Sequence, residues 1–165
     1  MTSKKSFTLI ELLVVVAIIG ILAAVGTPIF QGFMLDAKIN ASIAKHQNIR
    51  DFVSANLMRC STGAKSIKLQ EYYGQQSISC SDTPWNLAIA FAKHFKYTNM
   101  QNPYGGGSGS PVYASTDACL APGDTTIWGS SNVNQGRFVR VTTRVKDAPN
   151  ACSNDGRKQV YIPIE

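Results

Sequence analysis

The side chains that could support catalysis or hold a metal are few in this chain of 165 residues. The two histidines, His46 and His94, are far apart in the sequence, and the carboxylates are scattered. No Cys/His spacing suits zinc, and the glycine-rich run at residues 102–111 lacks the Gly-Lys-Ser/Thr of a phosphate loop. We therefore expect no enzyme, no metal site and no cofactor.

One carboxylate, Glu11, stands out because it lies at the start of an apolar segment. Residues 12–35 carry no charged side chain over 24 positions, and a helix of about 20 residues crosses the hydrocarbon core of a bilayer. Inserting an ionised carboxylate near such a run costs on the order of 2–3 kcal/mol or more unless a partner pairs with it. A cleaved secretory signal or a passive anchor does not need that cost. The acid therefore favours a third interpretation, an assembly surface with a specific partner for Glu11.

The apolar residues are concentrated in the N-terminal part of the chain, and two lysines precede them. Residues 1–35 hold 22 apolar residues of 35, and residues 36–165 hold 51 of 130. Lys4 and Lys5 precede the apolar run, and this predicts a cytoplasmic N-terminus with the polar body outside the cytoplasm. No second long apolar run occurs, which excludes a multi-span membrane protein.

Residues 4–13, KKSFTLIELL, and the following apolar helix with Gly20 and Pro28 closely resemble the N-terminus of type IV pilins and their relatives. The resemblance implies that a prepilin peptidase cuts between Ser6 and Phe7 and methylates the new amine of Phe7. The mature chain would have 159 residues and a net charge of +4 instead of +6. Ser6 departs from the family pattern, which usually has Gly at this position.

The resemblance divides the chain into a leader (residues 1–6), a hydrophobic transmembrane and assembly helix (7–34) and a globular head (35–165). It implies a structural subunit of a type IV pilus, a helical homo-oligomer that supports adhesion, surface motility or DNA uptake. Phe7, Glu11, Gly20 and Pro28 would serve assembly, with Glu11 meeting the N-terminus of a neighbouring subunit and setting the axial register.

The implied partners are the prepilin peptidase and the inner-membrane pilus assembly machinery. Before assembly the protein would span the bacterial inner membrane once, with its head in the periplasm, and afterwards it would be part of an extracellular pilus. Two alternatives stay open. One is a DNA-binding minor or competence pilin, and the other is the major pseudopilin of a type II secretion system, which shares the N-terminal pattern.

The expected fold is α+β, with a long N-terminal helix packed on a C-terminal antiparallel sheet. One helix should cover residues 7–59, with Pro28 either kinking it or permitting local melting between Gly26 and Gly32. Its second half is amphipathic, with Lys45 among the charged residues on other faces. The predicted apolar face, in which His46 fills a gap, consists of Leu35, Ile39, Ile43, Ile49, Val53 and Leu57.

The head sequence predicts a short helix and several strands. Thr83 and Pro84 are typical of a helix start, and the apolar face expected after them consists of Trp85, Ala88, Ile89, Ala92 and Phe95. Residues 137–146 alternate as in a half-buried strand, and Pro163 places the last strand, 160–164, at an edge. Residues 112–114 and 126–128 are lesser strand candidates.

The polar face of the strand at 137–146 carries a basic row, Arg140, Arg144 and Lys146. Together with a pI of about 9.3, this row is the basis for DNA as the alternative partner, since phosphate contact needs only a stripe of exposed cations. The competing interpretation is that these charges form a solvated sheet face or pair with acids on neighbouring subunits. An exposed strand face needs polar residues in any case.

The four cysteines lie in the part of the chain predicted to be outside the cytoplasm, where disulfides persist. Four cysteines allow three pairings, or free buried thiols. We favour the local pairing, Cys60 with Cys80 and Cys119 with Cys152. The second bond resembles the C-terminal disulfide loop of type IV pilins.

Overall fold

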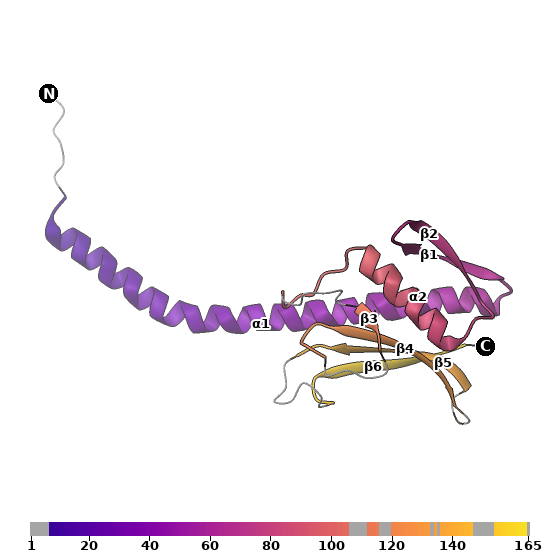
Figure 1. Ribbon diagram of the computed structural model, residues 1–165. Coiled ribbons are helices and arrows are strands. Elements are labelled where there is room, and N and C mark those ends of the chain that lie inside the picture. The colour runs from indigo at the N-terminus through magenta and orange to yellow at the C-terminus, as the bar shows by residue number, and fades with distance from the viewer. Residues whose placement is uncertain are drawn as a thin grey trace. The chain divides into compact units, whose positions relative to one another are not determined.

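The computed structural model describes residues 7–105, 112–115, 120–132, 134, 136–146 and 154–164. The chain divides into two compact units, one ending at Ala37 and the other beginning at Lys38. The first helix, α1, covers Leu9–Ser61 and includes residues of both units. The other elements, α2 and β1 to β6, belong to the second unit (Figure 1).

Helix α1 begins and ends two residues later than the predicted span of 7–59. It continues through Pro28, and residues 26–32 are helical, so the locally melted alternative is not what this structure contains. Pro28 removes one backbone donor. The hydroxyl of Thr27 beside it donates to the carbonyl of Ala23 at 2.7 Å.

The head contains two sheets. Strands β1 (Ser66–Glu71) and β2 (Gly74–Ser79) form an antiparallel hairpin that the sequence interpretation missed. The second sheet has the order β3-β4-β5-β6, formed by Val112–Ala114, Thr125–Asn132, Gly136–Arg144 and Arg157–Pro163. Strand β3 pairs with β4 in parallel, while the β4–β5 and β5–β6 pairs are antiparallel. The sheet is thus antiparallel-rich rather than wholly antiparallel, and the α+β class is confirmed.

Helix α2 (Pro84–Tyr97) begins as predicted, with the Thr83 side chain accepting a hydrogen bond from the backbone of Asn86 at 3.1 Å. Its buried face is the predicted one in part: Ala88, Ala92 and Phe95 are buried as expected. Leu87 and Phe91 are also fully buried, whereas Trp85 is exposed. The helix contacts β1 as well as β3, β4 and β5, and Figure 1 shows it between the hairpin and the four-stranded sheet.

One apolar core holds the second unit together. Ile49, Val53 and Leu57 of α1 share it with the inward-facing residues of α2, β1 and the large sheet. Strand β5 was expected to be half-buried, but every residue from Phe138 to Arg144 is buried. The physical reason is its central place between β4 and β6, with the core on one face and cross-strand neighbours on the other. Strand β6 is an edge strand, as Pro163 predicted.

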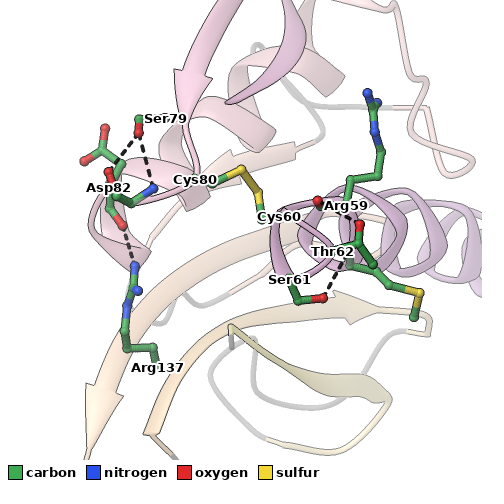
Figure 2. The surroundings of a disulfide bond; sticks show 10 residues. Arg59, Cys60, Ser61, Thr62, Ser79, Cys80, Asp82 and Arg137 are labelled. Carbon is green, nitrogen blue, oxygen red and sulfur yellow. Dashed lines mark hydrogen bonds between the residues drawn. A yellow bond between two sulfur atoms is a disulfide. The ribbon is translucent and has the colours of Figure 1, made fainter. Parts of the chain in front are cut away.

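A disulfide joins Cys60, at the end of α1, to Cys80, directly after β2 (Figure 2). This is the first of the two favoured bonds. The second, between Cys119 and Cys152, lies outside the described residues. Close to the disulfide, Arg137 of β5 donates to the backbone carbonyl of Asp82 at 2.6 Å, and this bond connects the loop before α2 to the large sheet (Figure 2).

Candidate functional site

Glu11 forms a reciprocal cap at the start of α1. Its Oε2 accepts hydrogen bonds from the backbone nitrogen of Thr8 at 2.8 Å and from the Thr8 hydroxyl at 2.7 Å. The backbone nitrogen of Glu11 in turn donates to Thr8 Oγ1 at 3.3 Å. This is a capping box, in which two otherwise unpaired helix donors are satisfied. The sequence interpretation overlooked it, although the Thr-x-x-Glu spacing is its signature.

The apolar side chains that follow Glu11 are exposed in the part of the chain that the structure describes. Large residues from Phe7 to Leu35 are all exposed, and Glu11 is the only charged residue among them. By length and composition α1 could cross a membrane, a test that a signal sequence near an N-terminus also passes. Such an area of apolar surface marks a membrane or protein contact.

The segment also contains the other residues that were predicted to act in processing or assembly: Ser6, Phe7, Gly20 and Pro28. Phe7 is exposed, and Ser6 lies outside the described residues. A methyl group added at Gly20 would meet no atom within 4 Å, so no contact with a described residue requires glycine there. The assembly roles of Gly20 and Pro28 stay predictions.

The basic row on β5 is not an exposed stripe. Arg144 is 0% exposed and Arg140 is 8% exposed, and only Lys146 is on the surface. Arg140 lies over the ring of Trp128 at 4.5 Å, its cross-strand neighbour on β4. All the interpretations of the row, phosphate contact, a solvated face and pairing with neighbouring subunits, required exposed guanidinium groups. The structure contradicts that requirement, because an alternating pattern does not reveal whether the second face of a strand is covered.

A buried polar cluster connects α1 to the large sheet. Lys45, expected on a solvent-facing side of α1, is buried, and its Nζ donates to the carbonyl of Gly123 at 2.8 Å. Burial lowers the pKa of Lys45 to about 8, and the nearby charge of Asp124 acts in the opposite direction. The contact spans 78 positions of sequence, which is why the local pattern around Lys45 could not indicate it.

His46 contributes to the same cluster. Its Nδ1 lies 3.0 Å from Thr143 Oγ1, which is 2.8 Å from Thr125 Oγ1. Burial, followed by the positive charges of Arg50 and Lys158, lowers the pKa of His46 to about 4. An imidazole beside a hydroxyl resembles an activated nucleophile. Here His46 is 5% exposed and both threonines are fully buried, so the cluster lies inside the head and joins α1 to β4 and β5.

His94 has a structural role of its own. Its Nδ1 accepts a hydrogen bond from the backbone nitrogen of Gln70 at 2.9 Å, and its ring stacks on Phe52 with centroids 4.4 Å apart. Burial lowers the pKa of His94. This residue thereby connects α2 to β1. Among the residues that the structure describes, no three His, Cys, Asp or Glu side chains gather to hold a metal.

Comparison with known proteins gives matches that are strongest at the N-terminus. Residues 1–27 match the family described as the prokaryotic N-terminal methylation motif. The chain is 39% identical over 56 residues to a fimbrial protein of Moraxella nonliquefaciens, covering 34% of this chain and 36% of that one. It is 50% identical over 42 residues to the type IV major pilin protein PilE1 of Neisseria gonorrhoeae, 26% of each chain. These matches thus span only about a third and a quarter of those relatives.

One relative matches along nearly the whole chain. The fimbrial protein EcpC of Eikenella corrodens is 31% identical over 157 residues, which is 92% of each chain. No solved structure gives a significant match. The similarity therefore covers the head as well as the N-terminal segment.

Proposed function

The chain belongs to the type IV pilin family, and we propose that it is a structural subunit of a pilus filament. Residues 7–34 hold the subunit in the inner membrane before assembly, with the head in the periplasm, and pack against other copies afterwards. The prepilin peptidase removes residues 1–6 and methylates Phe7, and the inner-membrane assembly machinery inserts the subunit into the filament. The filament supports adhesion, surface motility or DNA uptake.

The exposed apolar surface of the first unit is the observation on which this proposal rests. Every large side chain between Phe7 and Leu35 is open to solvent. Leaving apolar surface in water costs about 25 cal/mol for each Å², so this surface has to be covered by lipid or by protein. When a subunit moves from the membrane into a filament, the lipid around this surface is replaced by the helices of other subunits.

Glu11 is the residue that gives such a packing a fixed register. Uniformly apolar helices slide past one another with little change in energy, whereas a charge pair within the bundle penalises every register but one. We propose that the carboxylate of one subunit pairs with the amine of Phe7 in its neighbour. In the isolated chain the same carboxylate satisfies Thr8. Its two roles, cap and register, therefore need to be separated by experiment.

Two substitutions separate them. Glu11→Gln removes the charge but keeps an oxygen that can accept from Thr8, since glutamine also serves in a capping box. Thr8→Ala removes the hydroxyl bonds and keeps the charge. The gene for each variant replaces the native gene in the cell. Electron microscopy of sheared surface filaments then measures assembly. Membrane fractionation and the mass of the processed subunit, which begins at methylated Phe7, check insertion and cleavage.

If the charge sets the register, Glu11→Gln inserts and is processed but gives no filaments, because losing one partner of a buried pair costs about 3–5 kcal/mol. Thr8→Ala then assembles near the wild-type level. Wild-type filament yield from Glu11→Gln would contradict the proposal. Loss of filaments in Thr8→Ala together with wild-type yield from Glu11→Gln would assign Glu11 to the cap alone.

A further inference from the structure

The turn of the β1–β2 hairpin has an unusual composition. Glu71 pairs with Gly74, which leaves Tyr72 and Tyr73 as the two residues of the turn. Such turns are usually formed by Asn, Asp, Gly, Pro or Ser. The positive φ of 111° belongs to Gly74, which follows the turn. The backbone conformation of the turn therefore does not explain why tyrosines occupy its two positions. Two large aromatic residues stand where small polar ones are the rule.

The tyrosines form a small exposed cluster with a third from α2. Tyr73 is 90% exposed and Tyr72 is 71% exposed, and their ring centroids are 4.7 Å apart in an edge-to-face arrangement. Tyr97, at the end of α2, lies 5.9 Å from Tyr72 and is 38% exposed. We call these three residues the tyrosine tip. Figure 1 shows the hairpin turn close to one end of α2, in agreement with this contact.

The hairpin that carries the tyrosine tip is firmly attached to the head. Ile67 and Leu69 are buried in the main core. The backbone of Gln70 donates to His94, and Lys93 of α2 forms an ion pair with Glu71 at 3.3 Å. The Cys60–Cys80 disulfide holds the base of the hairpin (Figure 2). The exposed rings are thus presented by a rigid support, which lowers the entropy that a ligand would have to remove.

A lysine, Lys96, lies beside the tyrosine tip. The ammonium group of Lys96 lies 5.6 Å from the ring centroid of Tyr97, while Lys93 is balanced by Glu71. Residues 38–165 contain 14 Lys and Arg against 8 Asp and Glu, a formal charge of +6. Residues 38–165 therefore keep this positive excess after the leader is removed. Such a field favours the approach of polyanions.

We propose that the tyrosine tip binds single-stranded nucleic acid, with bases stacking on Tyr72 and Tyr73 and Lys96 contacting the phosphate backbone. Exposed aromatic rings beside cations are how proteins hold single strands without reading their sequence. In a duplex the bases are stacked on each other, so the rings would find no partner there. An acidic polysaccharide would meet the charge but has no aromatic bases to stack on the rings. This binding is additional to the filament role and does not depend on it.

The test measures binding of a fluorescently labelled 12-nucleotide oligothymidine to the full mature chain in a neutral detergent, by anisotropy at several salt concentrations. A duplex of the same length and a polyphosphate of similar charge are the comparison probes. Tyr73→Ala removes the most exposed ring, and Tyr73→Phe keeps it. Tyr161→Ala is the matched control, because Tyr161 is an exposed tyrosine on β6, away from the tip. Thermal unfolding checks that each variant is folded.

We expect oligothymidine to bind more tightly than the duplex or polyphosphate. Tyr73→Ala should weaken it by about tenfold, the scale of one stacked base. Tyr73→Phe and Tyr161→Ala should stay within about twofold of the wild type. Lys96→Gln should reduce the slope of log affinity against log salt by about 0.7. Lys146→Gln, two residues after β5, should leave it unchanged.

Unchanged binding by a folded Tyr73→Ala variant would overturn the proposal. Equal affinity for duplex, polyphosphate and oligothymidine would also overturn it, since charge alone would then account for the binding.

Discussion

His46 is a side chain whose protonation is opposed by the folded structure. Its pKa falls from 6.5 to about 4 because it is buried and faces the charges of Arg50 and Lys158. The unfolded chain binds the proton with the ordinary pKa, so falling pH favours unfolding. Stability that is complete above pH 6.5 is therefore lost as the pH falls towards 4. At about 1.4 kcal/mol for each pKa unit, the loss amounts to roughly 2–3 kcal/mol.

The measurement is the free energy of unfolding of the full chain in detergent at pH 7 and at pH 4. Carboxylates also contribute to acid destabilisation, so the comparison needs a variant that does not titrate at this position. In His46→Asn the amide can still reach the hydroxyl of Thr143. This variant should lose about 2–3 kcal/mol less than the wild type over the same pH range. The same pH dependence in both proteins would show that His46 contributes nothing to it.

At the scale of elements, the loop after α2 meets the loop before β4 at Gly123. The side chain of Asn102 donates to the carbonyl of Pro122 at 3.0 Å and to Asp124 at 2.9 Å. Gly123 has a φ of +82°, and a methyl group there would collide with the Asn102 amide. The backbone of Gly123 also donates to Arg144 at 2.7 Å and accepts from Lys45. One glycine thus allows α1, β5 and two loops to come together.

We expect Gly123→Ala to lower the free energy of unfolding by more than the conformational cost alone, which is about 1–2 kcal/mol. Gly105→Ala is the matched control, since Gly105 also has a positive φ, +61°, with nothing within 4 Å of an added methyl group. Denaturant unfolding of both variants measures the difference. If the free energy of unfolding falls equally in the two variants, the close contact with Asn102 contributes nothing to stability.

The elements also show what a sequence can and cannot predict. The start of α2 was predictable because a Thr-Pro cap acts through neighbouring residues, and Pro163 placed β6 at an edge for an equally local reason. The hairpin was not recognised, because Ile67 and Leu69 are its only fully buried apolar residues and its turn lacks the usual Asn-Gly signal. The burial of Arg140 depends on what covers the outer face of β5, which the alternation of one strand does not contain.

At the scale of the whole molecule, the charge and the apolar surface are divided between the two units. Residues 1–37 have two lysines and two acidic residues, so the formal charge of +6 belongs to residues 38–165. The first unit has exposed apolar side chains and no apolar core of its own among the described residues. The second has a complete core. The candidate assembly segment was predictable from the sequence because it is a continuous run, whereas the tyrosine tip needed the contact between β1, β2 and α2.

This division predicts that a chain beginning at Lys38 folds without the first unit. Every residue of the apolar core, and both cysteines of the described disulfide, lie after that position. The shortened chain should be monodisperse without detergent, because it lacks the apolar segment, and should unfold cooperatively. Its midpoint should lie within about 3 °C of that of the full chain in detergent, a shift that corresponds to less than about 1 kcal/mol. Circular dichroism and size-exclusion chromatography measure both properties, and the full chain without detergent, which should aggregate, is the control. A non-cooperative transition, or a much lower midpoint with the disulfide intact, would mean that residues before Lys38 contribute to the stability of the head.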